Sequence, residues 1–298
     1  IVVLKQTAPN TCGGTDATLD RAAPKEIASD ALIWFDGDCV LPYKDVARRD
    51  DGSCPAFLGY VHAFAAAAGE DTFLLLETGD SFHGREERKT DWALIRGNKM
   101  PDLARLIRDL DLARQNGYHS QTHGLPENFG GAVRASYATG ETISFADNQG
   151  PILSREQGEA LADWFTSTMA GERVPLPALD TLTAVRFEEK RENGGFTEAV
   201  LTLADGRVAR RSRYDDPTVY ESEKTLDADA IAALKDTVAQ TGLLAWERLP
   251  AREFAGGREK TLAFTFADGS TVTVRDDRVL PGSVSRGFFE VELPLTSS

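Results

Sequence analysis

The sequence has no apolar run long enough to cross a membrane, and its positive charges are outnumbered by its negative ones. A membrane-spanning helix needs about 20 predominantly apolar residues, whereas the longest runs here, at residues 63–68 and 73–76, are far shorter. The chain has 33 Lys and Arg against 47 Asp and Glu, which gives a formal net charge of −14. Because an acidic protein repels phosphate backbones, we do not expect nucleic acid as a partner.

The sequence also lacks the short motifs that mark well-known catalytic sites. It has no G-x-S-x-G, no H-E-x-x-H and no Walker or Rossmann glycine signature, so we predict no catalytic residue and no cofactor. Glu141 and Asp147 lie on one predicted hairpin at an even spacing, which would place them on the same face as an acid–base pair. The charged face of an exposed hairpin has the same pattern, and we favour that interpretation.

Cysteine is scarce: Cys12, Cys39 and Cys54 are the only three, and all lie in the first fifth of the chain. No CxxC occurs, which disfavours a zinc ribbon or a thioredoxin-like motif. Cys39 and Cys54 flank a loop rich in Pro, Asp, Arg and Gly, and a disulfide between them would staple that loop in an oxidising compartment. Three reduced thiols are the alternative.

The remaining composition, 41% hydrophobic and 27% charged, is typical of a folded globular protein. In the first half, alternating or apolar runs predict strands at 27–36, 58–66, 72–78, 132–137 and 142–146. Residues 101–115 predict a helix, because their leucines and Ile107 recur at helical spacing on one stripe. A second helix is expected from Ser154, since Ser154 and Gln157 have the spacing of a capping box.

The Val-Pro-Leu-Pro segment at 174–177 is the best candidate for a linker, and the same order of elements recurs after it. Strands are predicted at 182–190, 197–203, 208–214, 261–266 and 271–275, with a helix at 229–241. The halves align through Gly117 with Gly242, Leu125-Pro126 with Leu249-Pro250, Phe129 with Phe254, Gly131 with Gly257, and the turn Thr139-Gly140 with Asp268-Gly269. Such repetition predicts an internal duplication.

We therefore expect an α+β fold of two tandem units, each an antiparallel sheet packed on one or two helices. The first unit is expected at 26–173 and the second at 178–298, after an extended arm at 1–25. The sequence similarity between the two units is strongest from their helices onward and weakest in the hairpins that precede the helices.

Several motifs of the first half resemble a group of uncharacterised secreted proteins and lipoproteins from anaerobic, often gut-dwelling, Gram-positive bacteria. The motifs are Ala28-Ser29-Asp30, Asn116-Gly117-Tyr118, Gly124-Leu125-Pro126, Tyr137-Ala138-Thr139-Gly140-Glu141 and Phe145-Ala146-Asp147-Asn148-Gln149. The resemblance covers roughly residues 26–169 and implies an extracytoplasmic location and a function still unassigned. It is compatible with a lipid anchor upstream of this chain. In architecture alone, the chain is similar to the helix-plus-sheet repeats of β-lactamase inhibitor proteins.

His119 and His123 are the strongest candidates for metal ligands, because an extended segment would put both side chains on one face. Their separation is too long for close chelation unless the strand bends before Pro126. His62 and His83 could join them from an earlier hairpin, since neutral imidazole is a good zinc ligand. Two partly exposed histidines at a strand edge are the simpler interpretation.

An acidic group around the cysteine loop has the residue types that bind calcium. It consists of Asp36, Asp38, Asp50 and Asp51. The EF-hand spacing D-x-[DN]-x-[DN]-G is absent, so we expect a solvated acidic loop instead.

Aromatic residues fall mainly on the predicted strands and helices and are core candidates, although an uncovered face of an antiparallel sheet could bind a partner. We expect an extracytoplasmic, non-enzymatic protein that binds a protein or cell-envelope ligand. The alternatives are a metal-dependent hydrolase using His119 and His123, and a structural spacer in an envelope assembly. The first unit, which holds all four histidines, is the better candidate for a dedicated function.

Overall fold

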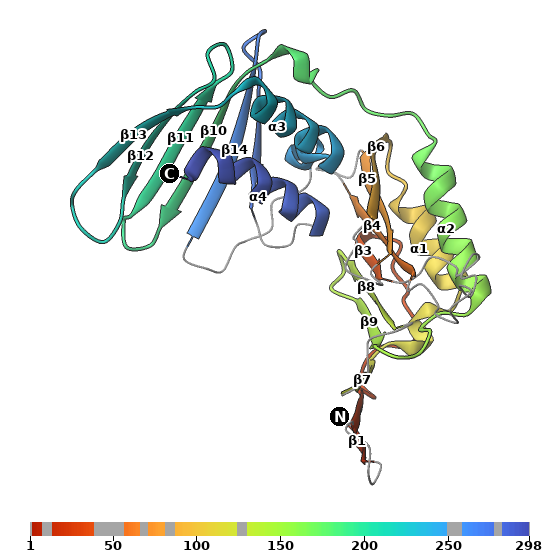
Figure 1. The fold of residues 1–298 in the computed structure, drawn as a ribbon. Coiled ribbons are helices and arrows are strands. Elements are labelled where there is room, and N and C mark those ends of the chain that lie inside the picture. Colours follow the sequence, from red (N-terminus) through yellow and green to blue (C-terminus); the bar gives the residue numbers. More distant parts are fainter. Residues whose placement is uncertain are drawn as a thin grey trace, which may run out of the picture. The chain divides into compact units, whose positions relative to one another are not determined.

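The computed structural model describes residues 2–7, 14–38, 57–65, 71–80, 87–123, 130–248, 258–276 and 282–297. The chain divides into two compact units, Ile1–Arg173 and Val174–Ser298, which are described one at a time (Figure 1). Both consist of antiparallel strands with a few helices, so the predicted α+β class is confirmed. None of the helices among the described residues is long and apolar enough to cross a membrane.

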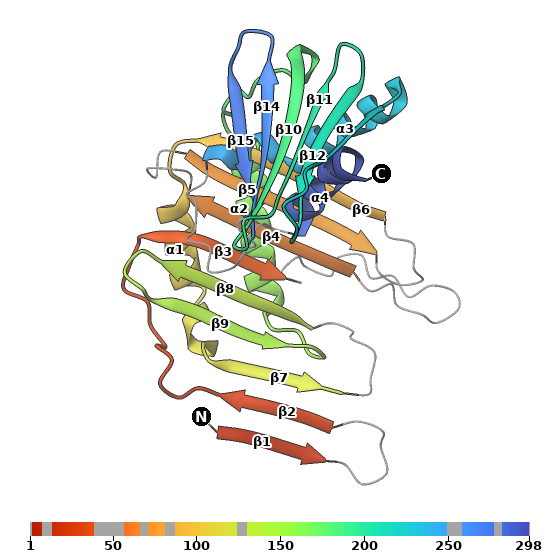
Figure 2. The same cartoon turned by 90° about the vertical axis from the view of Figure 1, so that its left-hand side faces the viewer.

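The first unit is a nine-stranded sheet in the order β1-β2-β7-β9-β8-β3-β4-β5-β6 (Figure 2). Its strands are β1 (Val2–Thr7), β2 (Gly14–Leu19), β3 (Leu32–Asp38), β4 (Phe57–Ala65), β5 (Asp71–Asp80), β6 (Glu87–Arg96), β7 (Tyr118–Thr122), β8 (Gly131–Tyr137) and β9 (Thr142–Asp147). All neighbours are antiparallel except β7 and β9, which are parallel. The residues expected as an extended arm thus form β1 and β2, which lengthen the sheet beyond β7.

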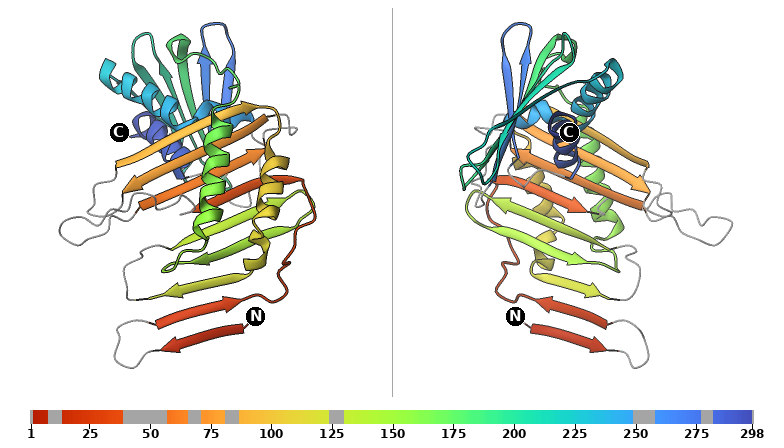
Figure 3. Two further views of the ribbon diagram at one scale, coloured as in Figure 1. Left: turned by 90° about the vertical axis from the view of Figure 1, so that its right-hand side faces the viewer. Right: turned by 60° about the vertical axis from the view of Figure 1, so that its left-hand side comes forward.

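Two helices cover one face of this sheet, α1 (Met100–Asp109) and α2 (Arg155–Met169) (Figure 3). Helix α1 buries Leu103 and Ile107, and α2 buries Leu161 and Phe165, against strand residues such as Phe35. Each fully buried side chain of this size contributes about 1.5–3 kcal/mol. The predicted capping box of α2 is confirmed, since the Ser154 hydroxyl accepts the N–H of Gln157 and the Gln157 side chain accepts the N–H of Ser154.

The second unit is a six-stranded sheet in the order β13-β12-β11-β10-β14-β15. Its strands are β10 (Leu182–Arg191), β11 (Phe196–Thr202), β12 (Arg207–Arg213), β13 (Tyr220–Thr225), β14 (Arg258–Phe266) and β15 (Thr271–Arg275). Short turns η3 (Leu179–Thr181) and η4 (Leu243–Arg248) and helices α3 (Ala228–Thr241) and α4 (Gly282–Thr296) complete it. The apolar core lies between the sheet and the two helices, which bury Leu234 and Val238 from α3 and Val291 and Leu295 from α4.

The second unit repeats the topology of six strands of the first. In each unit a four-stranded meander is followed by a helix, a 3₁₀ turn, a hairpin that pairs with the first meander strand, and a final helix. The meanders are β3–β6 and β10–β13, and the returning hairpins are β8–β9 and β14–β15. Even a local irregularity recurs, because the register shifts between Leu32 and Trp34 in one unit and between Leu182 and Ala184 in the other. A tandem duplication would produce this architecture.

The structure corrects one detail of the predicted alignment. We matched Gly117 with Gly242 as helix-stopping residues, but the residue that follows α1 in the left-handed region is Asp111, with φ of 53°. Gly242 has φ of 68° and, like Asp111, stands directly before a 3₁₀ turn, here η4 and there η2 (Leu112–Gln115). Gly117 comes after η2 and begins the approach to β7, so its predicted role as a helix stop is wrong.

Candidate functional site

Strands β1, β2 and β7 have no counterpart among the described residues of the second unit, and side-chain amides hold β7 at the edge of β9. The side-chain amide of Asn116 makes the first connection: its Oδ1 accepts the N–H of Ser144 at 2.8 Å, and its Nδ2 donates to the carbonyl of Thr142 at 2.8 Å. The same Nδ2 donates to the carbonyl of Pro24 at 2.9 Å. Asn116 is almost fully buried, and its amide takes the place that a neighbouring strand's peptide group would fill.

A second asparagine holds the other end of β7. The side chain of Asn148 accepts the N–H of Thr122 at 2.8 Å and donates to its carbonyl at 2.9 Å. Beside it, Asp147 accepts the N–H groups of Gln149 and Gly150 and the hydroxyl of Tyr118. Burial raises the pKa of Asp147, but these hydrogen bonds lower it further than burial raises it, so the pKa lies below its usual range.

The motifs that carry the resemblance therefore include residues with a structural task. Asn116, Tyr118, Asp147 and Asn148 fasten β7, and Glu141 accepts the hydroxyl of Thr139 and the N–H of Ala28. Because Glu141 and Asp147 are each committed to such bonds and no hydrogen bond joins them in the described structure, we assign no acid–base chemistry to this pair.

A depression of about 480 Å³ lies beside the point where the chain passes from η2 into β7. We call it the β7 pocket; its lining residues are Thr18, Asp20, Ala22, Ala23, Pro24, Asn116, Gly117, His119, Thr142 and Ser144. Gly117 is required here, because it has φ of 83° and an added Cβ would lie 2.5 Å from the carbonyl oxygen of Asp20. The pocket is thus shaped by the same residues that attach β7.

The walls of the β7 pocket offer several hydrogen-bonding groups to a ligand. The imidazole of His119 and the hydroxyls of Thr142 and Ser144 have no hydrogen-bond partner in the part of the chain that the structure describes. Asp20 uses one carboxylate oxygen for the N–H of Ala22 at 2.9 Å. Ser, His and Asp are the residue types of a hydrolytic triad, but no hydrogen bond links Ser144, His119 and Asp20 here, whereas a nucleophile and its base need such contact.

The two predicted metal ligands lie in different surroundings. His119 lies in the pocket wall, whereas His123 follows β7 and places its Nε2 3.7 Å from a carboxylate oxygen of Asp16. Within the described ranges, no group of three or more His, Cys, Asp or Glu side chains could hold a metal ion. In β4, His62 pairs with Asp36 across the backbone ladder, and His83 lies outside the described residues. The metal site remains a prediction.

The other predicted sites fall largely outside the described residues, which do not include Cys12, Cys39, Cys54, Asp50 or Asp51. Of the acidic group, Asp36 lies on the face of the sheet opposite the helices, 3.5 Å from Nη1 of Arg134. Burial raises the pKa of Asp36 to about 6, although Arg134 lowers it in part.

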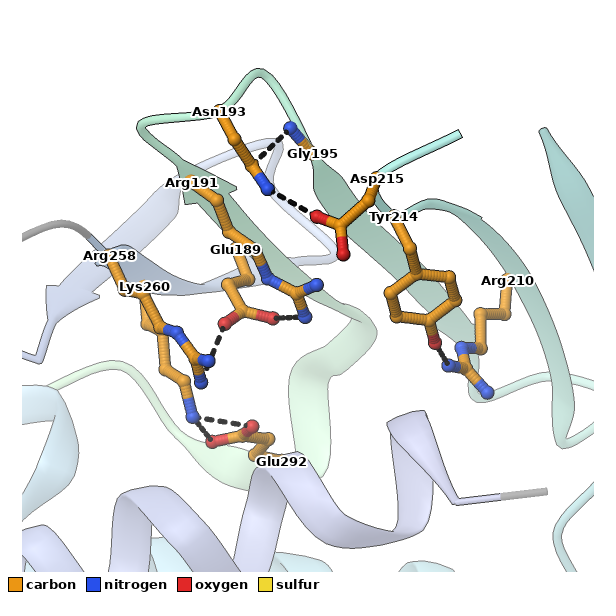
Figure 4. A network of polar contacts seen from close by, with 10 residues as sticks. All are labelled: Glu189, Arg191, Asn193, Gly195, Arg210, Tyr214, Asp215, Arg258, Lys260 and Glu292. Carbon is orange, nitrogen blue, oxygen red and sulfur yellow. Dashed lines mark hydrogen bonds and ion pairs between the residues drawn. The ribbon is translucent and has the colours of Figure 1, made fainter. Parts of the chain in front are cut away.

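The second unit contains a network of charged side chains on the helix side of its sheet (Figure 4). Glu189 is buried and pairs with Arg191 at 2.8 Å and with Arg258 at 3.7 Å. Lys260 binds both carboxylate oxygens of Glu292 at 2.7 and 2.8 Å, which connects β14 to α4. Because these charges pair with one another, we assign the network a structural role.

Sequence reasoning found His119 but missed the hydroxyl groups that share its pocket and both asparagine connections. No family model matches this chain, and no curated protein is significantly similar to it.

Proposed function

We propose that this chain is a non-enzymatic, extracytoplasmic protein that binds a protein or cell-envelope ligand through the β7 pocket of its first unit. One observation supports this most: strands β2 and β7, which contribute Thr18 and His119 to the pocket wall, have no counterpart among the described residues of the second unit. Added structure that is fixed by buried hydrogen bonds, yet leaves polar side chains without protein partners, is typical of a preformed binding site.

The extracytoplasmic location rests on the resemblance of the first-half motifs, and it is tested separately. Expression from the gene with its own upstream sequence, followed by cell fractionation, should place the protein outside the cytoplasmic membrane. Recovery in the cytosol alone would contradict the location without bearing on the pocket.

The binding proposal is tested by affinity capture from envelope extracts with a matched pair of variants. Ser144→Tyr fills the β7 pocket, and Thr273→Tyr makes the corresponding change at the equivalent strand position of the second unit. We expect the wild type and Thr273→Tyr to retain the same specific species and Ser144→Tyr to lose it. Capture of nothing above background, or equal capture by both variants, would overturn the proposal; thermal unfolding of each variant verifies that it is folded.

The alternative hypothesis, a metal-dependent hydrolase, predicts a different result when the metal content is measured. Protein purified without a histidine tag should then contain stoichiometric zinc that is lost in His119→Ala. We expect no stoichiometric metal, because the described residues supply no third ligand near His119. Elemental analysis decides this question, and zinc at one equivalent would reverse our preference.

A further inference from the structure

The outer edges of β9 and β15 are equivalent positions in the two units. Each is the second strand of the hairpin that returns to the sheet, and each pairs antiparallel with the first strand of that hairpin. The carbonyls of Glu141 and Ser270 accept the N–H groups of Tyr137 and Phe266 at the same point of the two turns. Counting from there, Thr142, Ser144 and Ala146 correspond to Thr271, Thr273 and Arg275, and these three positions direct their backbone groups outward.

In the first unit this edge is covered by the chain's own strand. The N–H of Gly117 donates to the carbonyl of Ser144 at 2.9 Å, and β7 then pairs in parallel with His119 beside Ala146. At the far end, the N–H of Asn148 donates to the carbonyl of Ser120 at 3.3 Å. The edge of β9 therefore accommodates a short parallel strand, with a register that is known residue by residue.

In the second unit, the described residues cover the same edge only in part. Glu247, which lies five residues after Gly242 as Asn116 lies five residues after Asp111, accepts the N–H of Thr273 at 3.0 Å. A carboxylate cannot donate, so it does not reproduce the bond from Asn116 to the carbonyl of Thr142. Among the described residues, the carbonyls of Thr271 and Thr273 and the N–H of Arg275 have no partner, and all three residues are exposed.

We propose that the edge of β15 binds an extended segment of a partner polypeptide, which adds a strand parallel to β15 as β7 does to β9. Such strand addition is a common mode of peptide recognition. The added segment would donate an N–H to the carbonyl of Thr273 and accept the N–H of Arg275. This site lies in the second unit and is independent of the β7 pocket.

The side chain of Arg275 indicates which charge the partner segment carries. Its guanidinium is exposed and forms no ion pair with the described residues. The residue that occupies the place of His119 would lie directly beside it on the same face, where an opposite charge is favourable. The partner segment therefore has Asp or Glu at this position.

The test uses two synthetic peptides with the sequence of residues 116–122, one unchanged and one with glutamate in place of His119. Binding to the full chain is followed through the backbone amide NMR signals of β15. We expect both peptides to shift the signals of Thr271, Thr273 and Arg275, and the glutamate peptide to bind about two- to fivefold more tightly.

Two variants separate the backbone contribution from the side-chain contribution. Arg275→Pro removes an outward N–H without removing a hydrogen bond to β14, and it should weaken both peptides about fivefold. Arg275→Ala keeps the N–H and should bind both peptides equally. If Arg275→Pro does not fold, the comparison with Arg275→Ala still tests the charge preference.

Three results would overturn the proposal. They are the absence of peptide-induced shifts in β15, wild-type binding by both variants, and self-association of the protein that Arg275→Pro abolishes. The last result would assign this edge to a second copy of the chain, and sedimentation velocity at several concentrations would detect it.

Discussion

Asn116 and Glu247 stand at the same place in two units of the same topology, and they treat the neighbouring strand edge differently. The amide of Asn116 both donates and accepts, so it begins a strand that covers the edge of β9. The carboxylate of Glu247 only accepts, and it satisfies one N–H of β15. The comparison indicates that the side chain at this position decides how many backbone groups of the neighbouring edge it satisfies, two for Asn116 and one for Glu247 among the described residues.

The largest effect is expected when Asn116 is made to resemble Glu247. Asn116→Asp loses two donated hydrogen bonds and places a charge at a buried position, which should lower the free energy of unfolding by about 3–5 kcal/mol. Glu247→Gln changes the equivalent group in the second unit and should alter stability by less than about 1 kcal/mol. Denaturant unfolding of both variants measures the difference, and equal losses would break the comparison.

A second contrast concerns charge on the faces opposite the helices. Asp36 occupies the strand position that Arg186 has in the second unit. Because the pKa of Asp36 is raised from 3.8 to about 6 in the folded chain, the folded state binds the proton more tightly than the unfolded state. Stability from this group is greatest below pH 4 and is lost as the pH rises through about 6, by up to about 3 kcal/mol.

Asp36→Asn removes this pH dependence. The wild type should therefore lose stability between pH 4 and pH 7.5 relative to the variant. The unfolding free energy of the variant minus that of the wild type should rise over this range. Denaturant unfolding at a series of pH values measures it, with Arg186→Gln as the control for the second unit. A difference that stays constant across this range would contradict the assignment.

The smallest effect distinguishes two glycines of the first unit that share a positive φ. Gly117 and Gly140 have φ of 83° and 87°, but an added Cβ meets the Asp20 carbonyl at Gly117 and open space at Gly140. Gly140→Ala should lower the free energy of unfolding by about 1 kcal/mol, because alanine is strained at a positive φ. Gly117→Ala should lower it by about 2 kcal/mol more, because its Cβ also clashes with the carbonyl of Asp20. Thermal unfolding would show this order, and equal losses would mean that the segment around Asp20 moves without cost.

Local pattern was sufficient to predict much of this fold. Alternating apolar residues gave most strands of both sheets, and the Ser154–Gln157 spacing gave the start of α2. The charged strands β6 and β13 were missed, because Glu87–Arg96 and Tyr220–Thr225 carry little or no apolar alternation over much of their length. Strand β7 was also missed, since its residues are only partly buried on either face.

The candidate site was harder to predict for a related reason. Asn116 reaches partners that lie 26 or more residues away in the sequence, and no periodicity encodes such a bond. The pairing of β2 with β7 likewise joins segments about a hundred residues apart, which only the folded sheet reveals. The histidine was visible in the sequence, whereas the hydroxyls that share its pocket became visible only once β9 was placed beside β7.

Hydrogen–deuterium exchange of the full chain, with and without the captured envelope ligand, tests the central claim most directly. If the β7 pocket binds the ligand, exchange should slow in β7 (Tyr118–Thr122) and in the first half of β9, while the equivalent segment of the second unit (Thr271–Arg275) is unchanged. Protection confined to the second unit, or none in either unit, would contradict the account.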